Sequence, residues 1–236
     1  MSESLPGAPL LSAANLTKNY GNSTALAGVS LQVRAGEATA VMGASGSGKT
    51  TLLHCLAGIV LPDAGTVRYS GAAPVEVTSL NDGARSALRR TEFGFVFQQG
   101  LLIPELTAGE NVALALMLNG TPRPAAEQQA AAALAALGLA GMEGRRIGEL
   151  SGGQAQRVAI ARAQVNGARV LFADEPTGAL DSRTSAEVMA LLLQSVAGTG
   201  RGLVVVTHDP EVARWCSRVV TLADGRIVAD TAEVAR

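Results

Sequence analysis

Short apolar runs recur along the chain, and several of them end at a polar side chain. Residues 39–42 form one such run, which leads through a glycine-rich turn into the helix-like segment 50–57. Three further runs end in the same way, namely residues 93–97 before Gln98, 170–173 before Asp174 and Glu175, and 203–206 before Thr207 and His208. Continuous apolar runs of this length are typical of strands buried on both faces of a parallel sheet. Ligands of open α/β sheets lie outside the carboxyl ends of the strands, so we expect these polar residues to meet at one site.

The pattern differs on either side of these runs. Residues 13–20 and 29–33 have the character of short, peripheral, antiparallel strands. Between Gln98 and Gly148 the strand pattern stops, and residues 111–118 and 125–137 are predicted to be helices. The sequence therefore predicts an inserted helical subdomain.

The chain has 236 residues, a length that one α/β domain with a subdomain accommodates. Residues 1–12 are polar and contain proline, so we expect a mobile N-terminal tail. Residues 13–236 are expected to form a single domain, with the helical subdomain at about residues 99–163. Near the C-terminus, residues 218–222 and 226–228 flank the sequence Ala223, Asp224, Gly225, which favours a β-hairpin.

Composition excludes several classes of protein. Hydrophobic residues make up 47% of the chain, but uncharged runs such as the alanine-rich 130–142 are too short for a membrane span of about 20 residues. The first nine residues include Glu3 and lack the basic stretch of a secretory signal, so we expect a cytoplasmic protein. A net charge of -1 gives no electrostatic footprint for nucleic acid. Cys55 and Cys216 show no metal-ligand spacing and are interpreted as reduced structural thiols.

The glycine-rich turn matches the P-loop pattern G-x-x-x-x-G-K-[ST]. Its residues are Gly43, Ala44, Ser45, Gly46, Ser47, Gly48, Lys49 and Thr50, and Thr51 follows. Small residues let backbone N–H groups surround phosphate oxygens, and the helix N-terminus adds positive potential. The pattern assigns the β and γ phosphates to Lys49 and a magnesium ion to Thr50. A glycine-rich turn without ligand is the alternative, and the predicted flanking strand and helix favour the nucleotide.

Asp174 and Glu175 follow a buried run and are expected at the sheet edge beside the P-loop. In P-loop NTPases the acidic residue of this strand holds the magnesium shell, which is the role predicted for Asp174. Glu175 is placed to orient or deprotonate the attacking water, so hydrolysis is predicted as well as binding. The alternative is a solvated turn before Pro176.

A second anion-binding surface is predicted at residues 150–154. Ser151 can cap a helix, while Gly152 and Gly153 leave backbone N–H groups open to an anion. Together with Leu150 and Gln154, this stretch resembles the signature motif of ABC ATPases. In that family the signature of one subunit closes over the nucleotide in the other subunit's P-loop. The resemblance therefore implies a two-fold dimer with two ATP molecules, which suits a symmetric interface.

Further residues resemble family elements in the expected order, across roughly residues 16–228. Tyr20 resembles the aromatic that stacks on adenine, and Gln98 resembles the loop glutamine that senses γ-phosphate, magnesium and the membrane partner. Asp181, after Ala179 and Leu180, resembles the loop that communicates across the dimer. His208 resembles the switch histidine that contacts γ-phosphate and supports the catalytic glutamate. Each has a plainer alternative: packed aromatic, solvated loop residue or capping residue.

Two departures from the family pattern are small. Ala44 stands where proline is common, and Gly109 where a larger residue is usual. The resemblance implies an α/β fold with a P-loop NTPase core and mostly parallel sheet, an antiparallel β subdomain and an inserted α-helical subdomain. It also implies ATP and Mg²⁺ as cofactors, a second copy of the chain as partner, and a separate integral membrane permease. No nucleic-acid partner is expected, and the chain is expected to lie peripherally on the inner face of the cell membrane.

Within the family, residues 95–99, 102–106 with Pro104, and 173–182 are most similar to the lipoprotein-release and macrolide-export group. An ATPase subunit of an amino-acid or metal importer is the alternative. Soluble ABC ATPases that act on ribosomes or DNA usually carry tandem domains or long coiled-coil insertions, whereas this chain has one set of motifs. A nucleotide-binding regulator without turnover is disfavoured, because both Glu175 and His208 are present.

Overall fold

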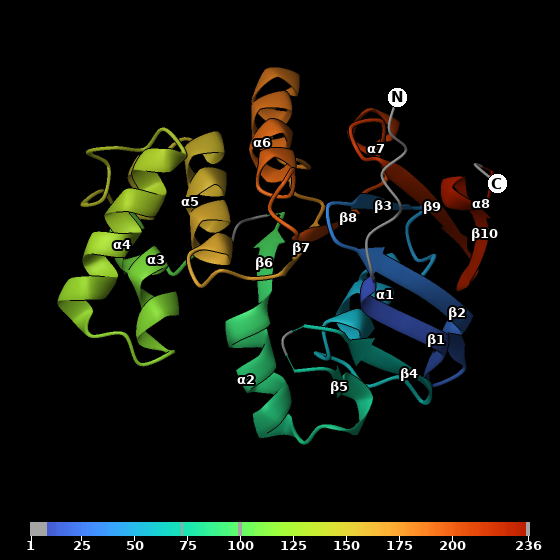
Figure 1. Cartoon of the computed structure of the whole chain (residues 1–236). Helices are drawn as coiled ribbons and strands as arrows, with labels where there is room; N and C mark the ends of the chain where they lie inside the picture. Colours follow the sequence, from blue (N-terminus) through green and yellow to red (C-terminus); the bar gives the residue numbers. More distant parts are fainter. Residues whose placement is uncertain (1–8, 72, 99–100, 235–236) are drawn as a thin grey trace.

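The computed structural model describes residues 9–71, 73–98 and 101–234, which form two sheets and a group of helices beside them (Figure 1). The larger sheet has six strands in the order β10-β9-β3-β8-β7-β6. Their bounds are Ala38–Met42 for β3, Phe93–Phe97 for β6, Val170–Asp174 for β7, Gly202–Val206 for β8, Arg218–Ala223 for β9 and Arg226–Asp230 for β10. All neighbours pair in parallel except β9 and β10.

The parallel strands lie where the apolar runs predicted them. β3, β7 and β8 are buried along almost their whole length, because helices and the second sheet cover both faces. The register places Phe97 opposite Asp174, and Asp174 opposite Val206. Strands β6, β7 and β8 therefore end side by side, and the polar residues that follow them emerge at one edge.

The smaller sheet is antiparallel, in the order β2-β1-β4-β5. Its strands are β1 (Pro9–Tyr20), β2 (Ser23–Arg34), β4 (Ala64–Tyr69) and β5 (Val75–Glu76). The expected tail over residues 1–12 is wrong in its last four residues, because β1 begins at Pro9 and Leu10 and Leu11 are buried in the core. The remainder of that tail, residues 1–8, lies outside the described residues.

The helices fill the space between and around the sheets. Their bounds are Lys49–Leu56 for α1, Asp82–Glu92 for α2, Ala108–Met117 for α3, Arg123–Ala136 for α4, Gly152–Gln164 for α5, Ser182–Gln194 for α6, Pro210–Ala213 for α7 and Thr231–Val234 for α8, with short 3-10 helices at Val77–Ser79 and Ile147–Glu149. α1 follows β3 directly, and its Leu52, Leu53 and Leu56 are buried in the cluster shared by the two sheets.

Helices α3, α4 and α5, here called the helical arm, stand to one side of the sheets (Figure 1). The arm has its own hydrophobic cluster, to which α5 contributes Val158 and Ala161. The opposite side of α5 contributes Ile160 and Ala163 to the cluster beneath α6 and the central sheet. α5 therefore joins α3 and α4 to the central sheet, and the predicted fold class is confirmed.

The sequence did not predict β4 and α2. β4 begins at Ala64 and Gly65, which weakens its strand pattern, and α2 is charged and amphipathic with no fully buried residue.

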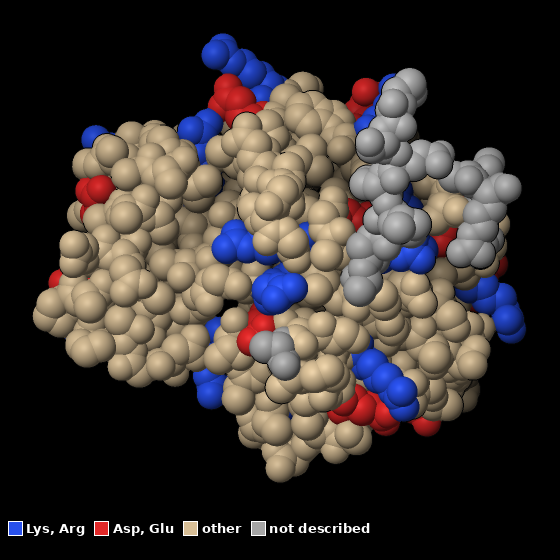
Figure 2. All heavy atoms as spheres, in the orientation of Figure 1, with Lys and Arg blue, Asp and Glu red and all other residues tan. Residues whose placement is uncertain are grey.

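No described helix combines the length and hydropathy that crossing a bilayer requires. In the view of Figure 2, Lys and Arg are interspersed with Asp and Glu and do not gather into one continuous face.

Candidate functional site

The P-loop connects the buried strand β3 to the first residue of α1. Gly43, Gly46 and Gly48 have φ values of 154, 81 and 102°, a region that side chains disfavour. Neighbouring backbone also leaves no room: a Cβ atom at Gly43 would lie 2.2 Å from the Leu222 carbonyl oxygen, and one at Gly48 would lie 2.2 Å from that of Ala25. These glycines are therefore required for the loop to pass between β9 and β2.

Lys49 lies across this loop rather than extending into solvent. Its Nζ atom donates to the carbonyl oxygens of Gly43 and Ala44, each at 2.8 Å, and the residue is 8% exposed. Ser47 Oγ is buried and has no hydrogen-bond partner among the described residues. A buried cation and an unpaired buried hydroxyl in one loop match the needs of an anionic ligand.

A pocket at this loop brings together groups that are distant in sequence. Its lining comprises Ala25, Ala44, Ser45, Gly46, Gly48, Lys49, Thr50, Thr51, Glu175, Val206 and His208. The loop and the start of α1 thus line the same space as a carboxylate and an imidazole. The arrangement can hold polyphosphate on one side and present an acid–base pair on the other.

Hard oxygen ligands lie beside this pocket. Thr50 Oγ1 donates to Asp174 Oδ2 at 3.2 Å, and Gln98 lines a neighbouring pocket together with Thr50, Asp174 and Glu175. Burial raises the pKa of Asp174 above its ordinary value, and the hydrogen bond from Thr50 opposes that shift. Hydroxyl, carboxylate and amide oxygens suit Mg²⁺, so the residues predicted as metal ligands fit that ion.

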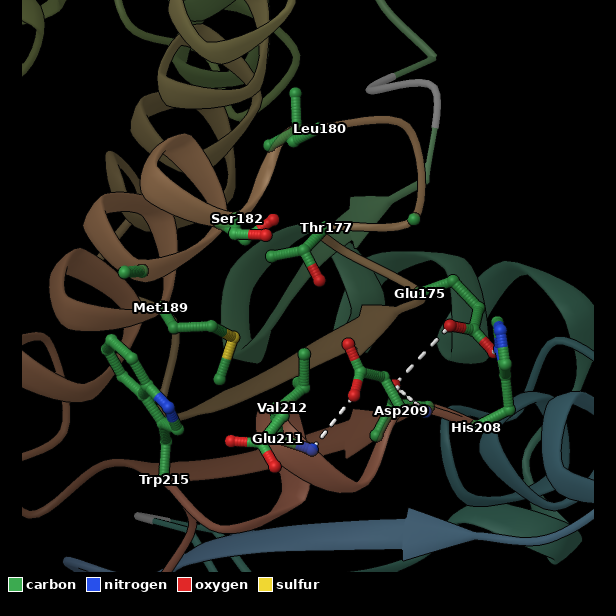
Figure 3. A pocket seen from close by; sticks show the side chains of 14 residues that line it. Glu175, Thr177, Leu180, Ser182, Met189, His208, Asp209, Glu211, Val212 and Trp215 are labelled. Carbon is green, nitrogen blue, oxygen red and sulfur yellow. Dashed lines mark hydrogen bonds and ion pairs between the residues drawn. The ribbon is translucent and has the colours of Figure 1, made fainter.

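Glu175 and His208 form a direct pair. The Nδ1 atom of His208 lies 2.7 Å from Glu175 Oε1, and Figure 3 shows the two side chains next to each other. Glu175 has a φ of 47°, unusual for a residue with a side chain, and its N–H donates to the Val206 carbonyl at 2.9 Å. The left-handed turn at Glu175 directs its carboxylate to the end of β8, from which His208 follows.

The signature residues lie at the start of α5. Ser151 Oγ accepts from the Gln154 N–H at 3.3 Å, and the Gln154 side chain accepts from the Ser151 N–H at 2.9 Å, forming a capping box. Ser151 and Gly152 are exposed, whereas Gly153 is buried against Thr184. None of these residues lines the P-loop pocket of the same chain. The signature cap and the P-loop pocket therefore lie at two separate places on one chain.

Two other predicted residues, Asp181 and Tyr20, lie outside the P-loop pocket. Asp181 caps α6, and its hydrogen bonds from the Thr184 backbone and hydroxyl hold the pKa of its carboxyl below the ordinary value. Tyr20, at the end of β1, is 51% exposed, and Lys18 Nζ lies 5.6 Å from its ring centroid. Tyr20 is not part of the pocket lining, so the structure does not bring it together with the P-loop residues.

The sequence predicted Thr207 at this edge of the sheet but assigned it no role, and it gave no indication of Gln156. Thr207 Oγ1 donates to Glu175 Oε2 at 3.5 Å and accepts from the Asp209 N–H at 3.0 Å. Gln156, in α5, is 3% exposed and bonds to backbone on both sides of the site. Gln156 lies near the start of α5 between Ala155 and Arg157, and nothing in this local sequence identifies its partners.

Comparisons with known proteins agree with this geometry. The model of the family described as ABC transporter matches residues 26–178. The macrolide export ATP-binding/permease protein MacB 1/2 of Paracoccus denitrificans is 48% identical over 228 residues, covering 95% of this chain. The pyoverdine export ATP-binding/permease protein PvdT of Pseudomonas fluorescens is 45% identical over 229 residues. The match covers 34% of each relative, so the chain spans about a third of their length.

A solved structure matches over almost its whole length. It is the ATP-binding cassette MJ0796 as a dimer in a post-hydrolysis state, bound to ADP and Pi. The TM-score is 0.84 at 38% sequence identity, and the match covers 93% of this chain and 97% of that one. With this agreement in fold, motifs and sequence, the chain belongs to the ABC transporter family, as one of its ATPase cassettes.

Proposed function

We propose that this cassette binds ATP with Mg²⁺, pairs with a second copy around two ATP molecules, and hydrolyses them to drive a membrane permease. One observation carries the proposal: the P-loop pocket holds Lys49 and Glu175, whereas the exposed signature cap at Ser151 faces elsewhere. Two such surfaces on one chain complete each other when a second copy is related by a two-fold axis. The dimeric MJ0796 cassette supports this arrangement.

The chemistry assigned to the site is in-line hydrolysis. The Glu175 carboxylate accepts a hydrogen bond from a water molecule and takes a proton from it as the water oxygen attacks the γ-phosphorus. The bond from that phosphorus to the β–γ bridging oxygen breaks, and ADP leaves with that electron pair. Lys49 and the loop N–H groups offset the phosphate charge, and Mg²⁺, held by Thr50, Asp174 and Gln98, would add positive charge there. His208 orients the Glu175 carboxylate through the 2.7 Å contact.

Closure of the dimer is a population shift driven by ligand. ATP favours the closed pair because its γ-phosphate contacts both the P-loop of one subunit and the signature of the other. Hydrolysis removes these bridging contacts, and the subunits separate. Leu180, in the loop before Asp181, lines the same pocket as Glu175 (Figure 3). Asp181 and this loop are proposed to contact the partner subunit, as the family resemblance implies.

An apolar surface near Gln98 supports docking of a permease domain or subunit. Leu101 and Leu118 are each 60% exposed. Arg162 connects them, because it donates to the Leu101 carbonyl at 2.8 Å and lines the same pocket as Leu118. Exposed large apolar side chains between the core and the helical arm are typical of an interaction site.

We assign the permease to the export or lipoprotein-release type, since the similar relatives are export ATP-binding/permease proteins. The cassette then lies on the cytoplasmic face of the membrane, where ATP is supplied. An importer ATPase is the second candidate, because the P-loop and signature geometry is common to both. Substrate specificity resides in the permease and not in the residues described above.

The test is to trap Glu175→Gln protein with ATP and Mg²⁺ in native membranes, isolate it gently and identify stoichiometric companions by mass spectrometry. A permease with few membrane helices and a large extracytoplasmic domain is expected. A multi-helix permease with a solute-binding protein would favour the importer, and ribosomal or DNA-repair companions would contradict transport. Lys49→Ala is the control. Because this variant should bind ATP weakly, the amount of companion protein that it recovers should be the same with and without ATP.

A further inference from the structure

Gln156 is a long polar side chain near the start of α5, and only 3% of it is exposed. A buried amide requires hydrogen-bond partners. Its Nε2 atom donates to the carbonyl oxygens of Phe97 at 3.1 Å and Pro176 at 2.8 Å. Because carbonyl oxygens only accept, the amino end of the amide must face both of them. Both of its N–H donors are thereby used on backbone outside its own helix.

The two carbonyls belong to the segments that carry the polar groups of the site. Phe97 ends β6 and precedes Gln98, while Pro176 follows Glu175. Phe97 is also the last β6 residue paired with β7, where it lies opposite Asp174. The β6–β7 ladder ends at this pair, and Gln156 links the two segments there.

Glu175 depends on such support because its φ of 47° lies in a region unfavourable for a residue with a Cβ atom. Such a conformation persists only where surrounding contacts hold it. One contact is the hydrogen bond from the Glu175 N–H to the Val206 carbonyl at 2.9 Å. The bond from Gln156 to the next residue, Pro176, fixes the other side of the turn.

α5 contacts its neighbours closely at three points along its length, so it can transmit a displacement of its signature end. Near its start, a Cβ atom at Gly153 would lie 2.4 Å from Thr184 Cγ2. One turn later, Arg157 Nη2 contacts Glu187 of α6 at 2.5 Å. Near its end, Ala163 is in such close contact with β6 that a Cβ atom at Gly94 would lie 2.2 Å from its carbonyl oxygen. A shift of the signature end therefore moves Gln156 with it.

We propose that Gln156 is a positioning residue that couples the signature loop of a subunit to its own Gln98 and Glu175. The inference rests on the proposed function, in which residues 151–153 contact the γ-phosphate in the partner's P-loop. ATP in the partner then sets the position of α5, and through Gln156 the turn that carries Glu175. The two sites of the dimer are coupled by this side chain, so hydrolysis depends cooperatively on ATP concentration.

The test replaces Gln156 by Met, which has a similar volume but no donor. Gln164→Met is the matched control, because it makes the same change in the same helix at an amide whose Nε2 has no partner among the described residues. ATPase rates are measured over a range of ATP concentrations, on the permease complex if the cassette alone is inactive. For Gln156→Met we expect kcat to fall about tenfold, KM to change less than about twofold and the Hill coefficient to approach 1. Gln164→Met should resemble the wild type in all three.

Equal kcat and Hill coefficients for Gln156→Met and Gln164→Met would overturn the inference, provided that the wild type hydrolyses ATP. Failure of the proposed function is distinguishable, because then the wild type itself would be inactive in the complex. If Gln156→Met shows no cooperative thermal unfolding, Gln156→Glu serves as the second variant, since it keeps the shape and removes both donors. Its kcat is expected to fall at least as far, and a wild-type kcat would overturn the inference.

Discussion

The Glu175 carboxylate lies 2.7 Å from the Nδ1 atom of His208, although 33 residues separate the two in the chain. The pair forms because β7 and β8 are parallel neighbours that end together, and the Glu175 N–H bonds to Val206 of β8. A carboxylate held in this way by an imidazole has a defined direction toward the P-loop pocket, which both residues line.

His208→Ala is expected to lower kcat for ATP hydrolysis by about tenfold to a hundredfold, because Glu175 loses the group that orients it. Nucleotide affinity should change little, since Lys49 and the loop N–H groups are unaffected. Steady-state ATPase rates and titration with a fluorescent ATP analogue measure the two quantities.

A double-mutant cycle checks that the effect passes through the pair. The effects of substituting residues that act as a unit are not additive. His208→Ala should therefore lower kcat by a much smaller factor in Glu175→Gln protein than in the wild type. Full additivity of the two losses would mean that His208 acts independently of Glu175.

The close contact between Gly153 and Thr184 gives a prediction with a built-in rescue. Gly153→Ala should lower ATPase activity about tenfold by displacing the signature loop, because its Cβ would lie 2.4 Å from Thr184 Cγ2. Thr184→Ser removes that methyl group and can keep the hydroxyl bond to Asp181, 2.7 Å long in the wild type. The double variant should therefore recover most of the activity.

Gly148→Ala is the matched control for this experiment, since nothing lies within 4 Å of a Cβ atom there. It should have wild-type activity. If Thr184→Ser fails to rescue Gly153→Ala, the loss arises from something other than this contact.

The C-terminal hairpin is held by a buried ion pair. Arg218 donates to both carboxylate oxygens of Asp230, at 2.9 and 2.6 Å, and their side chains are 10% and 8% exposed. Asp230→Asn is expected to lower the free energy of unfolding by about 3 kcal/mol at pH 7, because it removes one of the two carboxylates that pair with the buried guanidinium and leaves only Glu37, at 3.1 Å. Urea denaturation followed by circular dichroism measures the loss.

The stabilisation should also depend on pH in a defined direction. The hydrogen bond from Arg218 holds the pKa of Asp230 below its ordinary value. The contribution of the ionised Asp230 carboxylate to the free energy of unfolding is therefore fully present above its unfolded-state pKa of about 3.9. It is lost as the pH falls through the lower folded-state pKa. The difference in the free energy of unfolding between wild type and Asp230→Asn should therefore shrink as the pH falls through this folded-state pKa. Asp224→Asn, in the exposed turn of the same hairpin, should show no comparable loss at any pH.

The parallel core was predictable because its strands are buried on both faces, which leaves an uninterrupted apolar run such as residues 203–206. The site at its edge followed from the same pattern, since Asp174, Glu175 and His208 come directly after such runs. The start of β1 at Pro9 was not predictable locally, because Leu10 and Leu11 are ordered by packing against distant elements.

The role of Gln156 shows what sequence could not provide. A single glutamine in a helix carries no local signal of its partners, and both carbonyls that it contacts lie at least 20 residues away. The direction of Glu175 is similar, because its left-handed φ is imposed by the end of β8 and not by its own residue type. Neither feature has a periodicity that a sequence pattern can detect.

The central claim is that ATP joins two copies of this chain through the P-loop pocket of one and the signature cap of the other. Light scattering coupled to size-exclusion chromatography of Glu175→Gln protein, with and without ATP and Mg²⁺, tests it most directly. The account predicts a dimer with ATP and Mg²⁺, a monomer without nucleotide, and no ATP-induced dimer when Ser151→Arg is added to block the signature surface. A Glu175→Gln protein that binds ATP yet stays monomeric would contradict the account.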